Sequence, residues 1–190
     1  MAVTEPNSNA DSMKTKLNVG CGTDVKVGFV NIDIVPLPGV DIVHDLQSLP
    51  WPFENNLFDE IHLIHVLEHL TDTVGTLEEL HRISAPDAKV TIRVPYWNSP
   101  DMIADPTHKR QFSERTMAFF DPAKSECINR PYYSTARFQI ARLSAYIKCF
   151  IYIRVTSRPL TTILFFFARY LGGIVWVVEF ELVCRKGVEY

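Results

Sequence analysis

The sequence predicts an α/β fold built around a mostly parallel β-sheet. Three observations carry this prediction: short β-rich runs recur along the first half of the chain, the first run ends in a Gly-x-Gly turn, and an acidic residue lies in the second run. The first run with its turn is LNVGCG (Leu17–Gly22), and the second, FVNIDI, contains Asp33. Glycines after a strand leave bare backbone at the carboxyl edge of a sheet, where a ligand can approach the main chain.

The runs are short and rich in β-branched residues, which is typical of parallel strands that are buried on both faces. Between the last two, the segment Thr73–Ile83 has apolar residues at helical spacing and predicts a helix. The five predicted strands are Lys16–Val19, Phe29–Ile34, Asp41–Val43, Asp59–Ile64 and Lys89–Val94.

The second half of the chain is less regular. Pro95–Gln111 is rich in Pro, Asp and Asn and predicts a long loop, after which Ser113 is expected to cap a short helix that reaches Phe120. Two further strands are predicted from Tyr146 to Val155 and from Ile174 to Cys184.

The apolar segment Leu160–Val178 is nearly long enough to cross a bilayer. Arg169 lies in its middle and Gly172-Gly173 interrupts it, and a charge in mid-span is costly in lipid. We therefore expect a helix over Thr161–Leu171, a glycine turn and a buried strand, with no transmembrane segment. Contact with a membrane surface is the minor alternative.

The glycine turn and Asp33 together predict a nucleoside site, because a carboxylate at a strand end can accept both hydroxyls of a ribose. A dinucleotide fingerprint needs a third glycine, where this chain has Val25. Asp33 also follows Gly22 by only eleven residues, against the roughly twenty of a dinucleotide unit. A nicotinamide-dependent oxidoreductase is therefore disfavoured, and S-adenosylmethionine, which has a ribose and no phosphate, fits better.

Four segments in order resemble the class I S-adenosylmethionine-dependent methyltransferases, and most closely the small type 11-like group with an abbreviated first helix. They are LNVGCG, NID, DIVHDLQSLPWPFENNLFDEIHLIHVLEHL and LEELHRISAPDAKVTIRVP, which together span Leu17–Pro95. Asp24 replaces the usual third small residue of the first motif. The resemblance implies a Rossmann-like, mostly parallel sheet with an antiparallel C-terminal strand and abbreviated first helices.

The resemblance also implies S-adenosylmethionine as the cofactor and a set of residues that bind it. Gly20 and Gly22 would form the turn, Asp33 would bind the ribose, Asp45 and Leu46 would bind the adenine, and the backbone of His65 would border the methionine moiety. The full set of expected cofactor-binding residues is Asn18, Gly20, Cys21, Gly22, Asp33, Ile34, Asp45, Leu46 and His65.

A second polar cluster, DPTHKRQFS, follows the fifth predicted strand and resembles a signature of the same subgroup. When a methyl acceptor is a hydroxyl or an ammonium, a base must take its proton, and His is the usual candidate near neutral pH. His108 is predicted as this general base, and Lys109 or Arg110 as a clamp for an anionic group of the substrate.

The histidines also raise a metal hypothesis, because His62, His65 and His69 with Glu68 form H-x-x-H-x-x-E-H. The order is not H-E-x-x-H, and His62 lies in a run that reads as a strand. The sequence therefore predicts no metal site, and Glu68 and His69 are expected to cap a helix or line the pocket floor.

Composition limits the remaining choices. The net charge of −3 argues against a broad nucleic-acid surface. The four cysteines (Cys21, Cys127, Cys149 and Cys184) are far apart, which is typical of reduced cytosolic thiols. Residues 1–14 are expected to be a flexible tail and residues 15–190 one methyltransferase domain.

The predicted function is transfer of a methyl group to an unidentified acceptor, expected to be a small molecule, by a cytoplasmic enzyme. The main alternative is a methyltransferase-like module that binds the cofactor or a partner without turnover. The sequence does not identify the acceptor atom or the oligomeric state.

Overall fold

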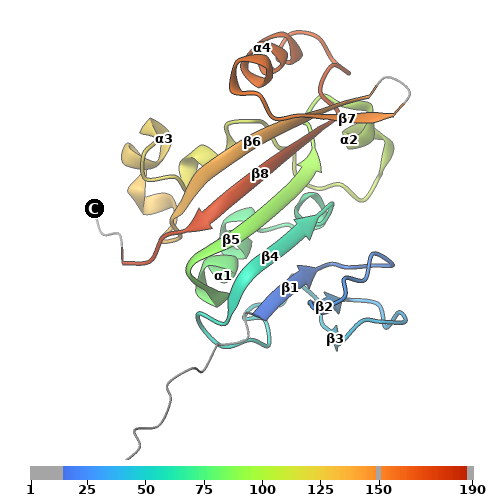
Figure 1. Ribbon diagram of the computed structural model, residues 1–190, viewed down its shortest axis with the longest axis vertical. Helices are drawn as coiled ribbons and strands as arrows, with labels where there is room; N and C mark the ends of the chain where they lie inside the picture. Colours follow the sequence, from blue (N-terminus) through green and yellow to red (C-terminus); the bar gives the residue numbers. More distant parts are fainter. Residues whose placement is uncertain (1–14, 149–150, 188–190) are drawn as a thin grey trace, which may run out of the picture.

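A computed structural model, which describes residues 15–148 and 151–187, contains an eight-stranded sheet of order β3-β2-β1-β4-β5-β8-β6-β7 (Figure 1). The first five strands pair in parallel, whereas β8 is antiparallel to both β5 and β6. The strands are β1 (Thr15–Val19), β2 (Val30–Asp33), β3 (Ile42–Val43), β4 (Phe58–Ile64), β5 (Ser84–Pro95), β6 (Phe138–Lys148), β7 (Tyr152–Val155) and β8 (Val177–Cys184). The predicted α/β class and the antiparallel C-terminal strand are confirmed.

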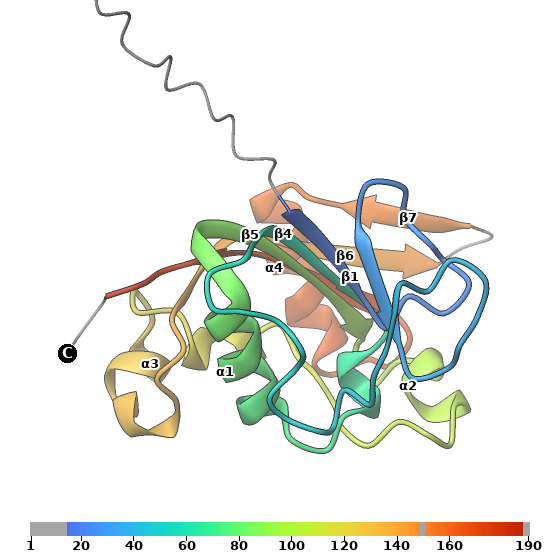
Figure 2. The same cartoon turned by 90° about the horizontal axis from the view of Figure 1, so that it is seen from below.

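The helices are short and gather on one face of the sheet, as Figure 2 shows for α1, α3 and α4. They are η1 (Leu67–His69), α1 (Thr73–Ile83), α2 (Pro100–Ala104), η2 (Thr116–Phe119), α3 (Ser125–Ile128), η3 (Pro131–Tyr133) and α4 (Arg158–Ala168), the η elements being 3-10 helices. The core lies between this layer and the sheet.

The helix α1 has the predicted bounds, and its apolar stripe explains its position. Leu77, Leu80 and Ile83 are fully buried in the core cluster, as expected for residues at helical spacing. Asp72 caps the helix, since its Oδ1 accepts the backbone N–H of Gly75 at 2.9 Å.

The opposite face of the sheet is polar, so the prediction of strands buried on both faces is wrong. Lys16 pairs with Glu60 at 2.7 Å on this face, and Arg93 pairs with Glu179 at 2.5 Å. The residues between β1 and β2 form turns instead of a helix, which confirms the abbreviated first helix. Within the described ranges no helix therefore covers this side, and the alternating polar residues of the strands face outward.

The C-terminal part departs from the prediction in one respect. The strand expected over Tyr146–Val155 is a hairpin of β6 and β7, which pair antiparallel. The helix and the last strand are confirmed in kind, but α4 begins three residues earlier than expected and β8 three residues later. Cys149 lies outside the described residues, as does the expected tail 1–14.

Two details of the long loop also differ. It contains α2, which Ser99 caps by accepting the N–H of Met102 at 3.2 Å. The short helix expected after Ser113 is only the 3-10 turn η2, which begins at Thr116 after Arg115, so Ser113 is not its cap. In the part of the chain that the structure describes, no helix is long and apolar enough to cross a membrane.

Candidate active site

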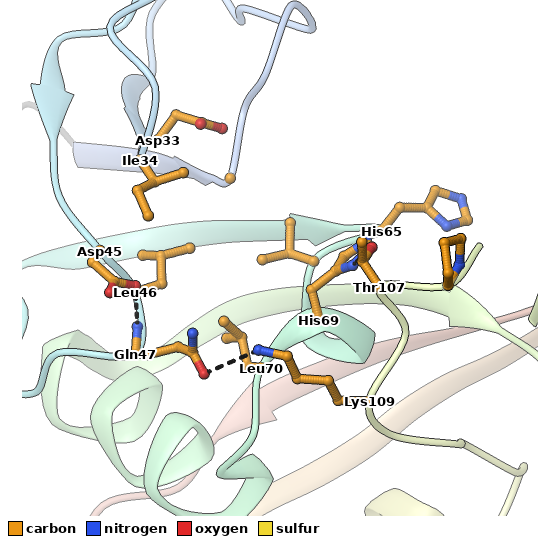
Figure 3. Close-up of a pocket in the computed structure, with 13 residues that line it drawn as sticks. Asp33, Ile34, Asp45, Leu46, Gln47, His65, His69, Leu70, Thr107 and Lys109 are labelled. Atoms are coloured by element: carbon orange, nitrogen blue, oxygen red, sulfur yellow. Dashed lines mark hydrogen bonds between the residues drawn. The ribbon is translucent and has the colours of Figure 1, made fainter.

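A cleft of about 520 Å³ lies where β1, β2 and β4 end, at the carboxyl edge of the parallel strands (Figure 3). This is the position at which open α/β sheets bind their ligands, and the volume is in the range of small-molecule pockets. The cleft is lined by Gly20, Asp33, Ile34, Asp45, Leu46, Gln47, His65, Val66, His69, Leu70, Pro106, Thr107 and Lys109.

The first side of the cleft is bare backbone at Gly20. This residue has a φ of +61°, and a Cβ placed on it would lie 2.4 Å from Cγ2 of Val66. Both the left-handed conformation and the close approach therefore require glycine. The turn continues to Gly22, whose N–H donates to Oδ2 of Asp33 at 2.7 Å.

The Asp33 carboxylate is held in place by two backbone donors. Besides Gly22, the N–H of Val35 donates to its Oδ1 at 3.0 Å. Each carboxylate oxygen can accept more than one hydrogen bond, so both can also accept from hydroxyl groups. The acceptor pair beside a turn without side chains fits the ribose of a nucleoside.

The loop that follows β3 supplies the apolar wall. Oδ1 of Asp45 accepts the N–H of Gln47 at 3.0 Å, which makes an Asx turn. The buried Trp51 anchors the loop, because its Nε1–H donates to the carbonyl of Leu46 at 3.0 Å. Across the cleft, the side chain of Ile34 is 59% exposed, so a flat ring could cover it.

Three predicted cofactor residues support the turn from behind instead of lining the cleft. The carboxamide of the buried Asn18 donates to the carbonyl of Asp24 at 2.8 Å and to Oδ1 of Asn31 at 3.0 Å. Cys21 is buried, and burial together with the Asp33 carboxylate raises the pKa of its thiol. The third is Gly22, whose contact with the site is its hydrogen bond to Asp33.

The far end of the cleft is formed by His65 and by three residues of the DPTHKR loop. His65 directly follows β4, has a φ of +56° and lines the cleft. Pro106, Thr107 and Lys109 also line it, although their loop was predicted to serve only the substrate. Nζ of Lys109 donates to Oε1 of Gln47 at 3.4 Å across the opening (Figure 3).

A second cavity of about 560 Å³ adjoins the cleft and shares His65, His69 and Pro106 with it. In the described part of the chain its lining contains three carboxylates and three imidazoles but no Lys or Arg. It is lined by His65, Glu68, His69, Pro95, Asp101, Ala104, Asp105, Pro106 and His108.

His108 lies in this second cavity and not in the cleft. Its side chain is 7% exposed, and its Nδ1 is 3.0 Å from the carbonyl of Met102. Because a carbonyl can only accept, Nδ1 is the donor and Nε2 carries the lone pair of the neutral ring. Arg110 lies outside both cavities, where its Nε donates to the carbonyl of Thr71 at 2.7 Å.

The histidine motif of β4 does not assemble as its spacing would allow. His62 is on the polar face of the sheet, 2.9 Å from Oε1 of Glu60. His65 precedes η1 instead of sharing a helical face with His69. Nδ1 of His65 is 3.3 Å from Oε1 of Glu68, and this contact lies at the edge of the second cavity.

The methyltransferase domain family model matches residues 5–139, more than half of the chain. No curated protein sequence matches significantly. Solved structures share the fold at low identity, and one is a complex between the Haloferax volcanii Trm112 methyltransferase activator and a methyltransferase (16% identity, 90% of this chain and 83% of that chain, TM-score 0.54).

Two further structures show how widely the fold is used. An S-adenosylmethionine-dependent methyltransferase from Archaeoglobus fulgidus matches with 16% identity over 90% of this chain and 86% of that chain (TM-score 0.54). The [4+2]-cyclase SpnF matches with 14% identity over 92% of this chain and 76% of that chain (TM-score 0.54). Fold alone therefore does not decide the chemistry. The family match does: the chain belongs to the methyltransferase domain family and is a class I S-adenosylmethionine-dependent methyltransferase.

Proposed function

We propose that the chain transfers a methyl group from S-adenosylmethionine, bound in the cleft, to a small molecule bound in the second cavity. The observation that carries this proposal is the junction of the two cavities at His65, His69 and Pro106. A methyl donor in one cavity would there meet an acceptor in the other. Holding the two reactants together in this way supplies much of the rate of a displacement reaction.

The residues of the cleft fit the parts of the cofactor. Asp33 would accept from the ribose hydroxyls, the Asp45–Leu46 loop would receive the adenine, and Ile34 would pack on its face. Gly20, which lines the cleft, would border the chain that carries the sulfonium. When bound, the cofactor supplies a methyl group on a positively charged sulfur.

The charge of the second cavity supports a neutral or cationic acceptor. Glu68, Asp101 and Asp105 line it, and its lining in the described ranges includes no cationic side chain. A phosphate or carboxylate of a substrate would be repelled there. The predicted clamp Arg110 faces away from this cavity, so the clamping of an anionic substrate stays a prediction without support from this geometry.

The position of His108 supports the role predicted from the sequence. The hydrogen bond from its Nδ1 to Met102 fixes the ring, and the Nε2 lone pair is free to accept a proton in the acceptor cavity. The role of His108 as a general base remains a proposal.

The experiment is calorimetry with S-adenosylhomocysteine and, separately, with NADH. We expect binding of S-adenosylhomocysteine alone. Asp33→Ala should weaken it by about 1.5–3 kcal/mol, or roughly 10–150-fold, because charge-assisted hydrogen bonds are lost. Asp24→Ala is the matched control, since Asp24 is exposed and pairs only with Lys26 among ion pairs of the described residues.

Thermal unfolding of both variants shows whether each remains folded. Unchanged affinity in a folded Asp33→Ala protein would remove this residue from the ribose site. A screen for methyl release with small amines and alcohols then tests the transfer itself. Binding without turnover across the whole screen would favour the alternative of a cofactor-binding module.

A further inference from the structure

We propose that Glu68, His69 and His108 form a binding site for a divalent transition metal, represented by Zn²⁺, on the floor of the second cavity. One potential ligand atom of each side chain lies within 4.8 Å of the other two. Two imidazoles and a carboxylate are a recognised ligand set for Zn²⁺ and Fe²⁺. The cluster differs from the histidine motif of the sequence, since its third member lies 39 residues beyond His69.

Glu68 gives the strongest independent sign of a missing ligand. Its side chain is fully buried, and among the residues that the structure describes none donates a hydrogen bond to Oε2. The other oxygen, Oε1, makes a long contact of 3.3 Å with Nδ1 of His65. A buried polar atom without a partner is costly, and a cation at Oε2 would remove that cost.

Both imidazoles present the same nitrogen to the cluster. Nδ1 of His69 is 2.9 Å from the hydroxyl oxygen of Thr107, which donates its own proton to Oδ1 of Asp105 at 2.6 Å. Nδ1 of His69 is therefore the donor, as is Nδ1 of His108 toward the carbonyl of Met102. Each ring is left with a lone pair on Nε2, in the second-shell arrangement that is typical of metal-binding histidines.

The backbone brings the two distant segments together before any ion binds. The carbonyl of Glu68 accepts the N–H of Lys109 at 2.7 Å and the N–H of Arg110 at 3.1 Å. The ring centroids of His69 and His108 consequently lie 4.8 Å apart. Metal bonds of about 2.0–2.2 Å require ligand atoms roughly 3–4 Å apart, so side-chain shifts of about 1 Å would close the site.

The chemistry of the ligands selects the metal. Mg²⁺ and Ca²⁺ prefer all-oxygen sites, whereas imidazole nitrogens favour Zn²⁺ and its transition-metal neighbours. Three protein ligands leave a coordination position open, as in catalytic zinc sites. Asp105 approaches His108, with 3.9 Å between its Oδ2 and Nε2, and adds negative charge beside the site.

If the proposed function holds, this site also changes the role of His108. Its single Nε2 lone pair can take either a proton or a metal, so the two roles exclude each other. A metal at this position could bind an oxygen or nitrogen of the acceptor and make it easier to deprotonate. The acceptor would then be a small molecule with a metal-binding hydroxyl or amine.

The test is calorimetric titration of Zn²⁺ into the chelator-treated full chain, followed by the visible absorption spectrum with Co²⁺. We expect one site per chain. Glu68→Gln and His69→Asn should each weaken binding by more than about 100-fold, because losing a ligand exceeds the roughly 10–100-fold cost of losing a second-shell partner. Thr107→Val should show that smaller loss.

His62→Gln is the control, because it removes an imidazole that lies outside both cavities. Equal Zn²⁺ affinity in the control and in Glu68→Gln would overturn the site, as would binding that Thr107→Val and His69→Asn leave unchanged. Glu68→Gln keeps the side-chain volume, and its thermal unfolding verifies the fold. Binding of S-adenosylhomocysteine is measured on the same samples, so failure of the metal site and failure of the cofactor site are separate results.

Discussion

The cofactor cleft and the second cavity are neighbours of similar volume but differ in the chemical groups that line them. The cleft is formed by backbone at Gly20, the two carboxylates of Asp33 and Asp45, and apolar walls. The second cavity is lined by six titratable side chains, one of which is the buried carboxylate of Glu68. The first is suited to bind a nucleoside by shape and hydrogen bonds, and the second is suited to hold protons or a cation. Binding and chemistry are thus assigned to separate surfaces.

Neighbouring residues of the DPTHKR loop line different cavities. Thr107 and Lys109 line the cleft, while His108 between them lines the second cavity. A substitution at Lys109 should therefore affect the cleft, and one at His108 the second cavity. The comparison between the two cavities can be tested at this loop and at the glycine turn.

The largest expected effect is on turnover in His108→Ala. We expect the rate to fall about 10²–10⁴-fold, because the substitution removes His108 both as a base and as a metal ligand. The affinity for S-adenosylhomocysteine should stay unchanged, because His108 does not line the cleft. Steady-state kinetics and calorimetry measure the two quantities. A parallel loss of cofactor affinity would show that the cavities are not separable.

Removing metal ions with a chelator distinguishes the two roles proposed for His108, metal ligand and general base. If His108 acts through a metal, treatment with EDTA should abolish turnover in the unmodified protein and Zn²⁺ should restore it. If His108 takes the proton directly, EDTA should have no effect and added Zn²⁺ should inhibit. We expect the first result, because Oε2 of Glu68 is buried without a hydrogen-bond donor among the described residues.

The next largest effect concerns the stability of the glycine turn. Gly22→Ala should cost about 1–2 kcal/mol, since a side chain is disfavoured at its φ of +48° and nothing else lies within 4 Å of the new Cβ. Gly20→Ala has a similar φ and adds the contact with Val66, so it should cost about 1–3 kcal/mol more. Urea unfolding measures the difference.

Val66→Ala in the Gly20→Ala protein separates the two causes. It should recover the packing part of the loss and leave the conformational part, although it adds a cavity of its own. If both single glycine variants unfold at the same urea concentration, the close approach of Gly20 to Val66 does not add to the stability cost of Gly20→Ala.

The sequence predicted the cleft better than the second cavity, and the reason is the length of chain that each one spans. Gly20 follows β1, Asp33 ends β2 and Asp45 lies just after β3. The ends of parallel strands meet at one edge of the sheet. Glu68 and His108 meet through backbone hydrogen bonds between distant segments. Spacing along the chain gives no signal for that contact, so the metal hypothesis was confined to the nearby His62, His65, Glu68 and His69 and did not include His108.

The burial of the sheet and its last hairpin were also predicted only in part from the sequence. Short apolar runs predicted strands that are covered on both sides, but Glu60, His62 and Arg93 alternate with the buried residues of β4 and β5. That alternation is the period of a sheet with one solvated face. The hairpin of β6 and β7 was missed because the two strands form a single β-rich run, and its turn has no glycine or proline to mark it.

The smallest expected effect is at Asp45, where the adenine is expected to bind. Asp45→Ala removes an acceptor for the adenine and also the Asx turn to Gln47, so affinity for S-adenosylhomocysteine should fall by about 0.5–1.5 kcal/mol. Asp45→Asn preserves the turn, because the amide oxygen can still accept from Gln47, but it places an amide donor beside the adenine amine. Calorimetry of the two variants therefore separates the roles. If Asp45→Asn binds as weakly as Asp45→Ala while its melting temperature is unchanged, the carboxylate contacts the ligand. If Asp45→Asn binds as tightly as the unmodified protein, Asp45 shapes only the loop, and recognition of the adenine falls to the backbone of Leu46 and the exposed face of Ile34.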